Sequence, residues 1–183
     1  MLNCEKGEIA VSSTGVIGEF LNTKSIIDAL SGTESKKGSS WLQAAEAIMT
    51  TDTFPKLSAK SLYIDKTEIN ILGIAKGSGM IEPNMGTMLS YIFTDANVDG
   101  SLLKSLLIDI TNNSFNSITV DGDTSTSDTV MLVSTNEASH SLISKADDPR
   151  VKSLKNALND VATDLAKQIV QDGEGATKFV EIS

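Results

Sequence analysis

The pair Gly86-Thr87, which follows the turn-rich segment Pro83-Asn84-Met85, is the best candidate in this sequence for covalent chemistry. If the bond between them were cut, Thr87 would become an N-terminal residue that carries a hydroxyl nucleophile and its own α-amine. The unperturbed pKa of an α-amine is about 7.7 to 8.0, so the amine could serve as the base near neutral pH without a histidine. Gly86 leaves its carbonyl open to attack, and the turn could hold that carbonyl under strain. The spacing alone leaves open that Gly-Thr simply precedes a strand.

The remaining residues of chemical interest favour structural roles. His140 is the single histidine, and its polar surroundings predict a solvated surface residue rather than the base of a catalytic triad. The segment 121–128 places aspartates at its first, third and eighth positions, but Leu132 stands where a calcium-binding EF-hand needs glutamate. We therefore expect no metal site there, but a turn whose carboxylates and hydroxyls accept hydrogen bonds from backbone N–H groups. The segment 76–80 lacks the residue order of a nucleotide-binding P-loop.

Apolar residues recur at every second position in some segments, which is typical of strands, and at spacings of three or four in others, which is typical of helices. Strands, with helices between and after them, must therefore position these residues. The pattern predicts a fold of the α/β class, of the α+β type, with a mixed sheet and packed helices. The expected strands are residues 8–13, a hairpin within 57–75, 88–93, 118–120, 129–133 and 178–182. The expected helices lie within residues 16–32, 41–49 with Ser40 as the N-cap, 99–110, and from Pro149 with Asp148 as the N-cap to an end at Gly173.

Composition narrows the class of protein. The 183 residues are 40% hydrophobic, which predicts about one domain with a real core. The lone Cys4 excludes a disulfide framework and a four-thiolate zinc site. A formal net charge of −9 and an aromatic content of 4% argue against a nucleic-acid partner. Because no apolar run approaches the length of a membrane span and the start lacks a secretory signal, we expect a soluble, cytoplasmic protein.

Five motifs in order resemble the ornithine acetyltransferase family, also called the bifunctional arginine biosynthesis proteins. The motifs are SSTGVIGE at 12–19, AIMTTDTFPK at 47–56, GIAKGSGMI at 73–81 with PNM at 83–85, ITVDGDTST at 118–126, and DGEGATKF at 172–179. The resemblance runs from about Glu8 to the last residue, and family chains extend beyond both ends. It implies that this chain is an interior piece, a single partial domain of residues 1–183.

The resemblance implies an acetyltransferase that moves acetyl from N-acetylornithine to glutamate, with acetyl-CoA as a further co-substrate in some members. No other cofactor is expected. Such proteins cleave themselves, so residues 1–86 would end the α chain and residues 87–183 would begin the β chain. The expected assembly is a hetero-tetramer of two α and two β chains with the architecture of an N-terminal nucleophile enzyme.

The same resemblance makes Thr87 the nucleophile and new N-terminus, with the cut after Gly86. Glycine stands at position 86 where the family usually has alanine, and the family's C-terminal segment, which completes the substrate pocket, is missing. Thr14 and Gly15 are similar to the family's oxyanion pair, a hydroxyl and a backbone N–H that stabilise the tetrahedral intermediate.

Three further residues, Thr50, Lys76 and Glu174, are similar to the family's substrate contacts. Glu174 suits a substrate ammonium, and Lys76 suits a substrate carboxylate or the charge of the intermediate. Apart from the resemblance, Thr50 would be interpreted as a helix-end hydroxyl, Lys76 as a solvated lysine and Glu174 as a loop acid.

Two alternatives remain at this point. One is a self-cleaving aminopeptidase with an N-terminal nucleophile. The other is a non-catalytic, truncated fragment that folds only with complementary segments.

Overall fold

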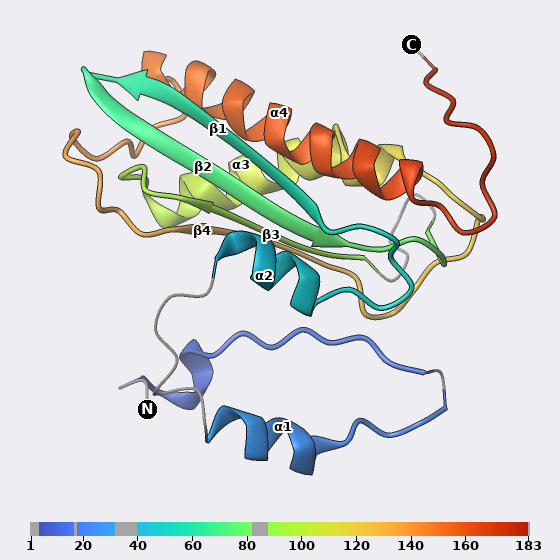
Figure 1. Cartoon of the computed structure of the whole chain (residues 1–183). Helices are drawn as coiled ribbons and strands as arrows, with labels where there is room; N and C mark the ends of the chain where they lie inside the picture. Colours follow the sequence, from blue (N-terminus) through green and yellow to red (C-terminus); the bar gives the residue numbers. More distant parts are fainter. Residues whose placement is uncertain (1–3, 17, 32–39, 82–87, 183) are drawn as a thin grey trace.

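A four-stranded mixed sheet forms the centre of the molecule (Figure 1). The computed structural model describes residues 4–16, 18–31, 40–81 and 88–182. The strands are β1 (Lys56–Ile64), β2 (Thr67–Lys76), β3 (Leu89–Thr94) and β4 (Thr129–Ser134), and they lie in the order β1-β2-β3-β4. The pairs β1–β2 and β2–β3 are antiparallel, whereas β3–β4 is parallel. The mixed sheet and the α/β fold class predicted from the sequence are confirmed.

The hairpin β1–β2 turns through two residues. Ile64 pairs with Thr67, which leaves Asp65 and Lys66 as the loop. Both loop residues have positive φ, 49° and 68°, as a type I′ turn requires. This turn matches the natural twist of the two strands, so the predicted hairpin is confirmed.

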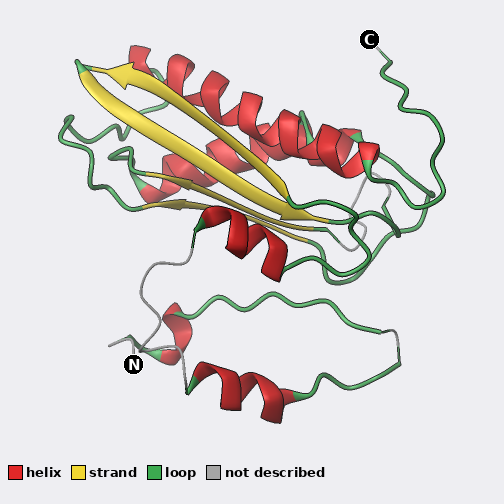
Figure 2. Ribbon diagram, in the orientation of Figure 1, coloured by secondary structure: helices red, strands yellow, loops and turns green. Residues whose placement is uncertain are grey.

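Two helices cover one face of the sheet (Figure 2). Helix α3 (Gly100–Asn112) begins at its N-cap Asp99, and α4 (Pro149–Gln171) begins at its N-cap Asp148. Both caps accept hydrogen bonds from N–H groups of the first turn, which would otherwise lack partners. Nine residues of α4 are buried, in the repeating pattern that predicted this helix.

Glycine is required where α4 crosses β2. A Cβ atom built on Gly73 would lie 2.6 Å from Leu165 Cδ1 and 3.0 Å from Val161 Cγ1. Leu165 and Val161 are themselves buried, so neither can move away at little cost. The absence of a side chain at Gly73 therefore sets how closely α4 approaches the sheet.

The short helix α2 (Trp41–Ala47) lies against the opposite face of the sheet (Figure 2). Its Trp41 ring packs on Phe93 of β3, with 4.9 Å between the ring centroids. The preceding residue, Ile92, points to the face that α4 covers, since its Cγ1 would lie 3.4 Å from a Cβ built on Gly73. Successive strand residues point to opposite faces, so Phe93 points to the other face, where α2 lies. Ser40 caps α2 in a capping box with Gln43, as the sequence predicted.

The N-terminal arm, defined here as residues 4–16 and 18–31, runs outside this layered body (Figure 1). It contains a 3-10 helix, η1 (Lys6–Glu8), and helix α1 (Thr23–Leu30), and neither has a buried residue. A hydrogen bond between the hydroxyls of Ser12 and Tyr91 links the arm to β3. This hydrogen bond joins the arm to the sheet near Thr14.

Three predicted strands are wrong, and the reason is common to all of them. Residues 9–13, 118–120 and 178–182 have no strand partner among the described residues, and residues 6–8 form η1. A strand needs a neighbour to satisfy its backbone groups, and local composition cannot supply one. The exposure of Val11, at 82%, and of Ile182, at 94%, shows that these apolar side chains are not packed.

The predicted helix within 16–32 begins later than expected. Gly18 has a φ of +84°, which no right-handed helix contains, and Asn22 forms the N-cap of α1 by accepting a hydrogen bond from Ser25 N. The short segment Phe115–Ser117 forms a further 3-10 helix, η3, after α3. No helix within the described ranges has the length and apolar character needed to cross a bilayer.

Candidate functional site

The C-terminal end of β2 carries a buried cation. Lys76, the last residue of β2, is only 3% exposed, so it is not the solvated lysine that the sequence alone would suggest. Its Nζ lies 3.9 Å from Oδ2 of Asp52. Burial lowers the pKa of Lys76 below its ordinary value, and nearby Lys56 adds to this effect, whereas Asp52, Glu174 and Asp128 oppose it. The carboxylates around Lys76 thus favour its charged form, whereas burial disfavours it.

Asp52 belongs to a buried ion cluster with Lys56 and Asp172. Lys56 Nζ donates to Asp52 Oδ1 and to Asp172 Oδ2, each at 2.6 Å, and all three side chains are almost fully buried. The cluster joins the segment before β1, the start of β1 and the end of α4. Gly77 N also donates to Asp52 Oδ1 at 2.6 Å, so the cluster holds the chain just beyond Lys76.

Hydrogen bonds keep both carboxylates of this cluster ionised. Burial alone would raise the pKa of Asp52, but hydrogen bonds from Gly77 N, Lys56 and Thr50 N outweigh it and leave the pKa below its usual value. The same balance, with Lys56 and Thr53 as donors, lowers the pKa of Asp172. A buried cluster of this kind is a rigid support because each charge has fixed partners.

Thr50 and Glu174 also lie near the C-terminal end of β2, where Lys76 is found. The backbone N–H of Thr50 donates to Asp52 Oδ2 at 3.0 Å, and the N–H of Glu174 donates to the carbonyl of Ser78 at 2.6 Å. The Glu174 carboxylate lies against Gly79, where an added Cβ would come within 3.0 Å of Oε2. The three residues expected to contact substrate, Thr50, Lys76 and Glu174, are therefore brought together from distant parts of the sequence.

Thr14 and Gly15 line a different hollow, on the N-terminal arm. With neighbouring arm residues, Met80 and residues 124–127, they enclose a pocket of about 420 Å³. Residues 124–127 lead directly into Asp128, and Met80 lies four residues after Lys76. The oxyanion pair expected from the sequence thus lies across a pocket from the loop that approaches the end of β2.

Residues Gly86 and Thr87, the expected cut and nucleophile, lie outside the described residues. The chain on either side of the segment 82–87 is held by the loop 121–128. Asp121 accepts hydrogen bonds from Met80 N and Ile81 N, at 2.5 and 2.8 Å. Asp128 accepts one from Met88 N at 2.7 Å. The prediction that this loop's carboxylates bind backbone N–H groups is confirmed.

Asp121 and Asp128, two of the three aspartates of this loop, have pKa values that are shifted in opposite directions. Burial raises the pKa of Asp121, but N–H donors that include Ile81 and Met80 more than compensate, so the net pKa is lowered. Burial dominates at Asp128 and raises its pKa to about 6, despite the opposing effects of Met88 N and Lys76. Oδ2 of Asp128 is buried and has no hydrogen-bond partner among the described residues.

His140 is buried, at 4% exposure, so the prediction of a solvated surface histidine is wrong. Its Nε2 accepts a hydrogen bond from Asn97 N at 3.0 Å, and its Nδ1 lies 2.9 Å from the carbonyl of Ser141, to which it donates as N–H. Both ring nitrogens are therefore used to hold the connection between β3 and α3. His140 thus supports the structure of this connection and is not exposed to solvent.

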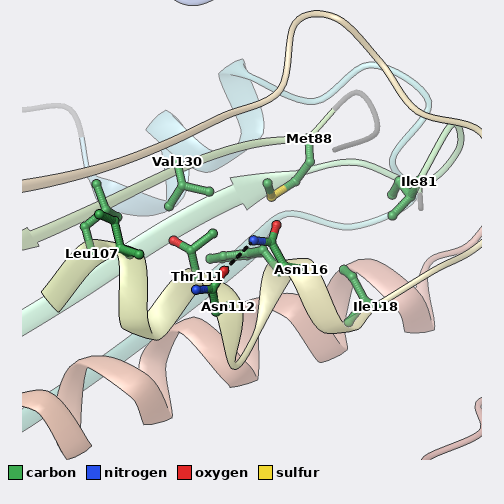
Figure 3. A pocket seen from close by; sticks show the side chains of 10 residues that line it. Ile81, Met88, Leu107, Thr111, Asn112, Asn116, Ile118 and Val130 are labelled. Atoms are coloured by element: carbon green, nitrogen blue, oxygen red, sulfur yellow. Dashed lines mark hydrogen bonds between the residues drawn. The ribbon is translucent and has the colours of Figure 1, made fainter. Parts of the chain in front are cut away.

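A second, mainly apolar pocket of about 250 Å³ lies between α3 and the sheet (Figure 3). Its lining includes Ile81 and Met88, the two described residues that flank the segment 82–87. Asn116 Nδ2 donates to Asn112 Oδ1 at 2.9 Å beside this pocket. Among the residues that the structure describes, no group of three or more His, Cys, Asp or Glu side chains could hold a metal ion.

Sequence reasoning missed Asp52, Lys56 and Asp172 as a buried cluster. Asp52 and Lys56 lie in the AIMTTDTFPK motif, and Asp172 begins the DGEGATKF motif. The motifs therefore include these residues but do not indicate a role for them. Lys56 and Asp172 are 116 positions apart, and no local pattern signals such a pairing. Asp128 was considered only as a turn residue.

Comparison with known proteins gives a consistent result across the chain. The ArgJ family matches residues 1–183. The arginine biosynthesis bifunctional protein ArgJ of Agrobacterium fabrum is 47% identical over 186 residues, which cover 100% of this chain and 45% of that protein. The protein of the same name from Zymomonas mobilis is 47% identical over 182 residues, with 100% and 44% covered. This chain thus spans slightly under half the length of these relatives.

A solved structure also aligns with part of the chain. The crystal structure of the arginine biosynthesis bifunctional protein ArgJ from Bacillus halodurans is 48% identical, with a TM-score of 0.48. The alignment covers 50% of this chain and 43% of that one.

Proposed function

The chain belongs to the ArgJ family, and on that basis we propose that it forms the nucleophile-bearing part of an acetyltransferase of arginine biosynthesis. The reaction is the transfer of acetyl from N-acetylornithine to glutamate, with acetyl-CoA as a further donor. The observation that carries this proposal is the convergence of Thr50, Lys76 and Glu174 at the end of β2. One cation and one carboxylate there match the carboxylate and the ammonium of an amino-acid substrate.

Self-cleavage after Gly86 prepares the nucleophile in this proposal. The cut falls between β2 and β3, which pair through six residues of each strand. The sheet therefore holds the α and β chains together after the peptide bond between them is lost. The two cut chains then associate further into a tetramer of two α and two β chains, in the cytoplasm.

The transfer itself proceeds through an ester. The Thr87 hydroxyl attacks the acetyl carbonyl, and its proton passes to the α-amine of the same residue. The Thr14 hydroxyl and the Gly15 N–H stabilise the oxyanion, and the amide bond breaks as the leaving nitrogen of ornithine takes up the proton. The amine of glutamate then attacks the ester, which frees the Thr87 hydroxyl and yields N-acetylglutamate.

Charge at the end of β2 orients both amino acids in turn. Lys76 binds the substrate carboxylate and Glu174 binds the substrate ammonium. Because the ion cluster below fixes Asp52, it holds the Lys76 ammonium in one place while the substrates exchange. One pocket serves both amino acids, so ornithine leaves before glutamate binds.

Intact-mass analysis after incubation near neutral pH tests this function. We expect two products, residues 1–86 and 87–183, from the purified chain. Thr87→Ala removes the hydroxyl that attacks the Gly86 carbonyl, so this variant stays whole. A neighbouring substitution outside the chemistry, Thr129→Ala, provides the control and is cut like the parent. A Thr87→Ala variant that is cleaved at the parent's rate excludes Thr87 as the nucleophile, and a parent that stays whole supports the non-catalytic alternative.

A further inference from the structure

Gly79 leaves room for the carboxyl group of Glu174. A Cβ atom built on Gly79 would lie 3.0 Å from Oε2 of Glu174, 3.1 Å from its Cδ and 3.5 Å from its Oε1. Apart from the chain on either side of Gly79, these three atoms are the nearest heavy atoms to that Cβ. The carboxyl group of Glu174 therefore lies in the place that a side chain at residue 79 would take.

The backbone of Glu174 is fixed, whereas its side chain is not. The N–H of Glu174 donates to the carbonyl of Ser78 at 2.6 Å, which ties residue 174 to the residue before Gly79. Two residues before Glu174, Asp172 is held in the buried ion cluster by Lys56. The side chain of Glu174 is exposed and rotates about single bonds. If a methyl group were added at Gly79, the carboxylate would thus be the part that moves.

The position of this carboxylate affects the charge of Lys76. Burial lowers the pKa of Lys76 and nearby Lys56 adds to this effect, whereas Asp52, Glu174 and Asp128 oppose it. Because Glu174 is exposed and Lys76 is buried, the open direction for a displaced carboxylate is toward solvent, away from Lys76. The charge of Lys76 therefore depends on where the Glu174 carboxylate lies.

We propose that Gly79 is a positioning residue, because its missing side chain leaves the place from which the Glu174 carboxylate binds the ammonium of an amino-acid substrate. The part of this inference that concerns substrate rests on the proposed function, in which Glu174 contacts the ammonium. The part that concerns the position of the carboxylate rests on the geometry at Gly79. A side chain at residue 79 would thus weaken recognition of the ammonium through Glu174.

Gly79→Ala is the variant that tests this inference. The φ of Gly79 lies outside the left-handed region, so alanine fits this backbone. The matched control is Gly100→Ala at the start of α3, where an added Cβ meets no atom within 4 Å. We expect both variants to fold like the parent, as thermal unfolding followed by circular dichroism will show.

The first measurement is the pKa of Lys76, followed by NMR titration of its side chain in the absence of ligand. We expect this pKa to fall in Gly79→Ala and to stay unchanged in Gly100→Ala, because only the first substitution displaces the Glu174 carboxylate. In a Glu174→Gln background, Gly79→Ala should have no further effect, since the displaced group then carries no charge. A disturbance that does not act through Glu174 would lower the pKa in both backgrounds.

The second measurement compares the binding of glutamate with that of glutarate, which has both carboxylates but no ammonium. Gly79→Ala is expected to weaken glutamate binding at least about 10-fold, the size of a lost charge-assisted hydrogen bond. Glutarate binding should stay unchanged, because glutarate has no group for Glu174 to bind. NMR titration of the purified chain measures both affinities, and a general disturbance of the pocket would weaken both ligands.

The two measurements separate this inference from the proposed function. A fall in the Lys76 pKa that depends on Glu174, together with a loss of affinity for glutamate alone, supports the inference. An unchanged pKa in Gly79→Ala overturns it, as does an equal fall in the Glu174→Gln background. A Gly79→Ala variant that does not fold also overturns it, because the methyl group then meets something other than a movable carboxylate.

Glutamate binding by the parent tests the proposed function separately. If the parent prefers glutamate to glutarate and Gly79→Ala keeps this preference, the role of Gly79 is wrong and the proposed function stands. If the parent binds both ligands equally, Glu174 is not the ammonium contact, so that contact in the proposed function is wrong and the substrate part of this inference is wrong with it. The Lys76 pKa still decides whether Gly79 positions the carboxylate.

Discussion

Lys76 shows how a single side chain at this site depends on its neighbours. Its burial disfavours the ammonium, and the carboxylate of Asp52, 3.9 Å away, favours it. In the proposed reaction the positive charge is what binds a substrate carboxylate. The position of Asp52 therefore matters to a residue that it does not directly hydrogen-bond.

Asp52→Asn is expected to lower the pKa of Lys76 further, because burial and Lys56 then act with one opposing carboxylate fewer. The pKa can be followed by NMR titration of the Lys76 side chain. The control is Asp172→Asn, which weakens the same cluster at Lys56 but leaves Asp52 beside Lys76. A Lys76 pKa that is unchanged in Asp52→Asn, or that falls equally in both variants, contradicts this account.

Lys56 acts at the scale of elements, since it fastens the start of β1 to the end of α4 through Asp172. Lys60, on the same strand, also pairs with α4, through Asp160, but both of these side chains are about half exposed. Each lysine thus forms an ion pair between β1 and α4, one buried and the other exposed to solvent. Water screens the Lys60–Asp160 pair, whereas the Lys56–Asp172 pair is buried and not exposed to water.

Lys56→Met is expected to reduce the free energy of unfolding by about 3–5 kcal/mol, because it leaves two buried carboxylates without their cation. Lys60→Met should cost no more than about 1 kcal/mol. Urea denaturation of the two variants measures both values. Equal losses would mean that the buried cluster contributes no more than the exposed pair, contrary to this structure.

Elements with complete local signals were the ones that sequence analysis could predict. Helix α4 has its cap, its proline and its apolar period within one stretch, and the hairpin β1–β2 has its own turn. Strands predicted at 118–120 and 178–182 failed because strand pairing depends on a distant partner. For the same reason the motifs indicated Thr50 and Lys76, whereas the cluster beneath them, which joins residues more than a hundred positions apart, required the structure.

At the scale of the whole molecule, packing is uneven. Helix α4 buries nine residues, whereas α1 in the N-terminal arm buries none and leaves Ile26, Ile27 and Leu30 about half exposed or more. The arm nevertheless carries Thr14 and Gly15, which the proposed reaction needs beside the loop at 124–127. The body of the fold thus holds the proposed substrate contacts more firmly than it holds the proposed oxyanion pair.

Amide hydrogen exchange, read by mass spectrometry, should reveal this difference. The amides of α1 are expected to exchange far faster than those of α4 and β2, because opening the arm exposes no buried surface of α1. Protection of α1 equal to that of α4 would show that the arm is packed as tightly as the body, which this structure does not support.

In the proposed reaction Thr87 becomes an N-terminal nucleophile that carries the acetyl group. The most direct measurement is the mass of the product that begins at Thr87, after the purified protein is incubated with N-acetylornithine alone and then with added glutamate. We expect one acetyl group on the Thr87 hydroxyl in the first step and its loss in the second, because the ester is an intermediate that reacts with the amine of glutamate. Transfer of acetyl to glutamate without any acetylated Thr87, together with intersecting double-reciprocal plots, would contradict the account and indicate direct transfer between the two amino acids.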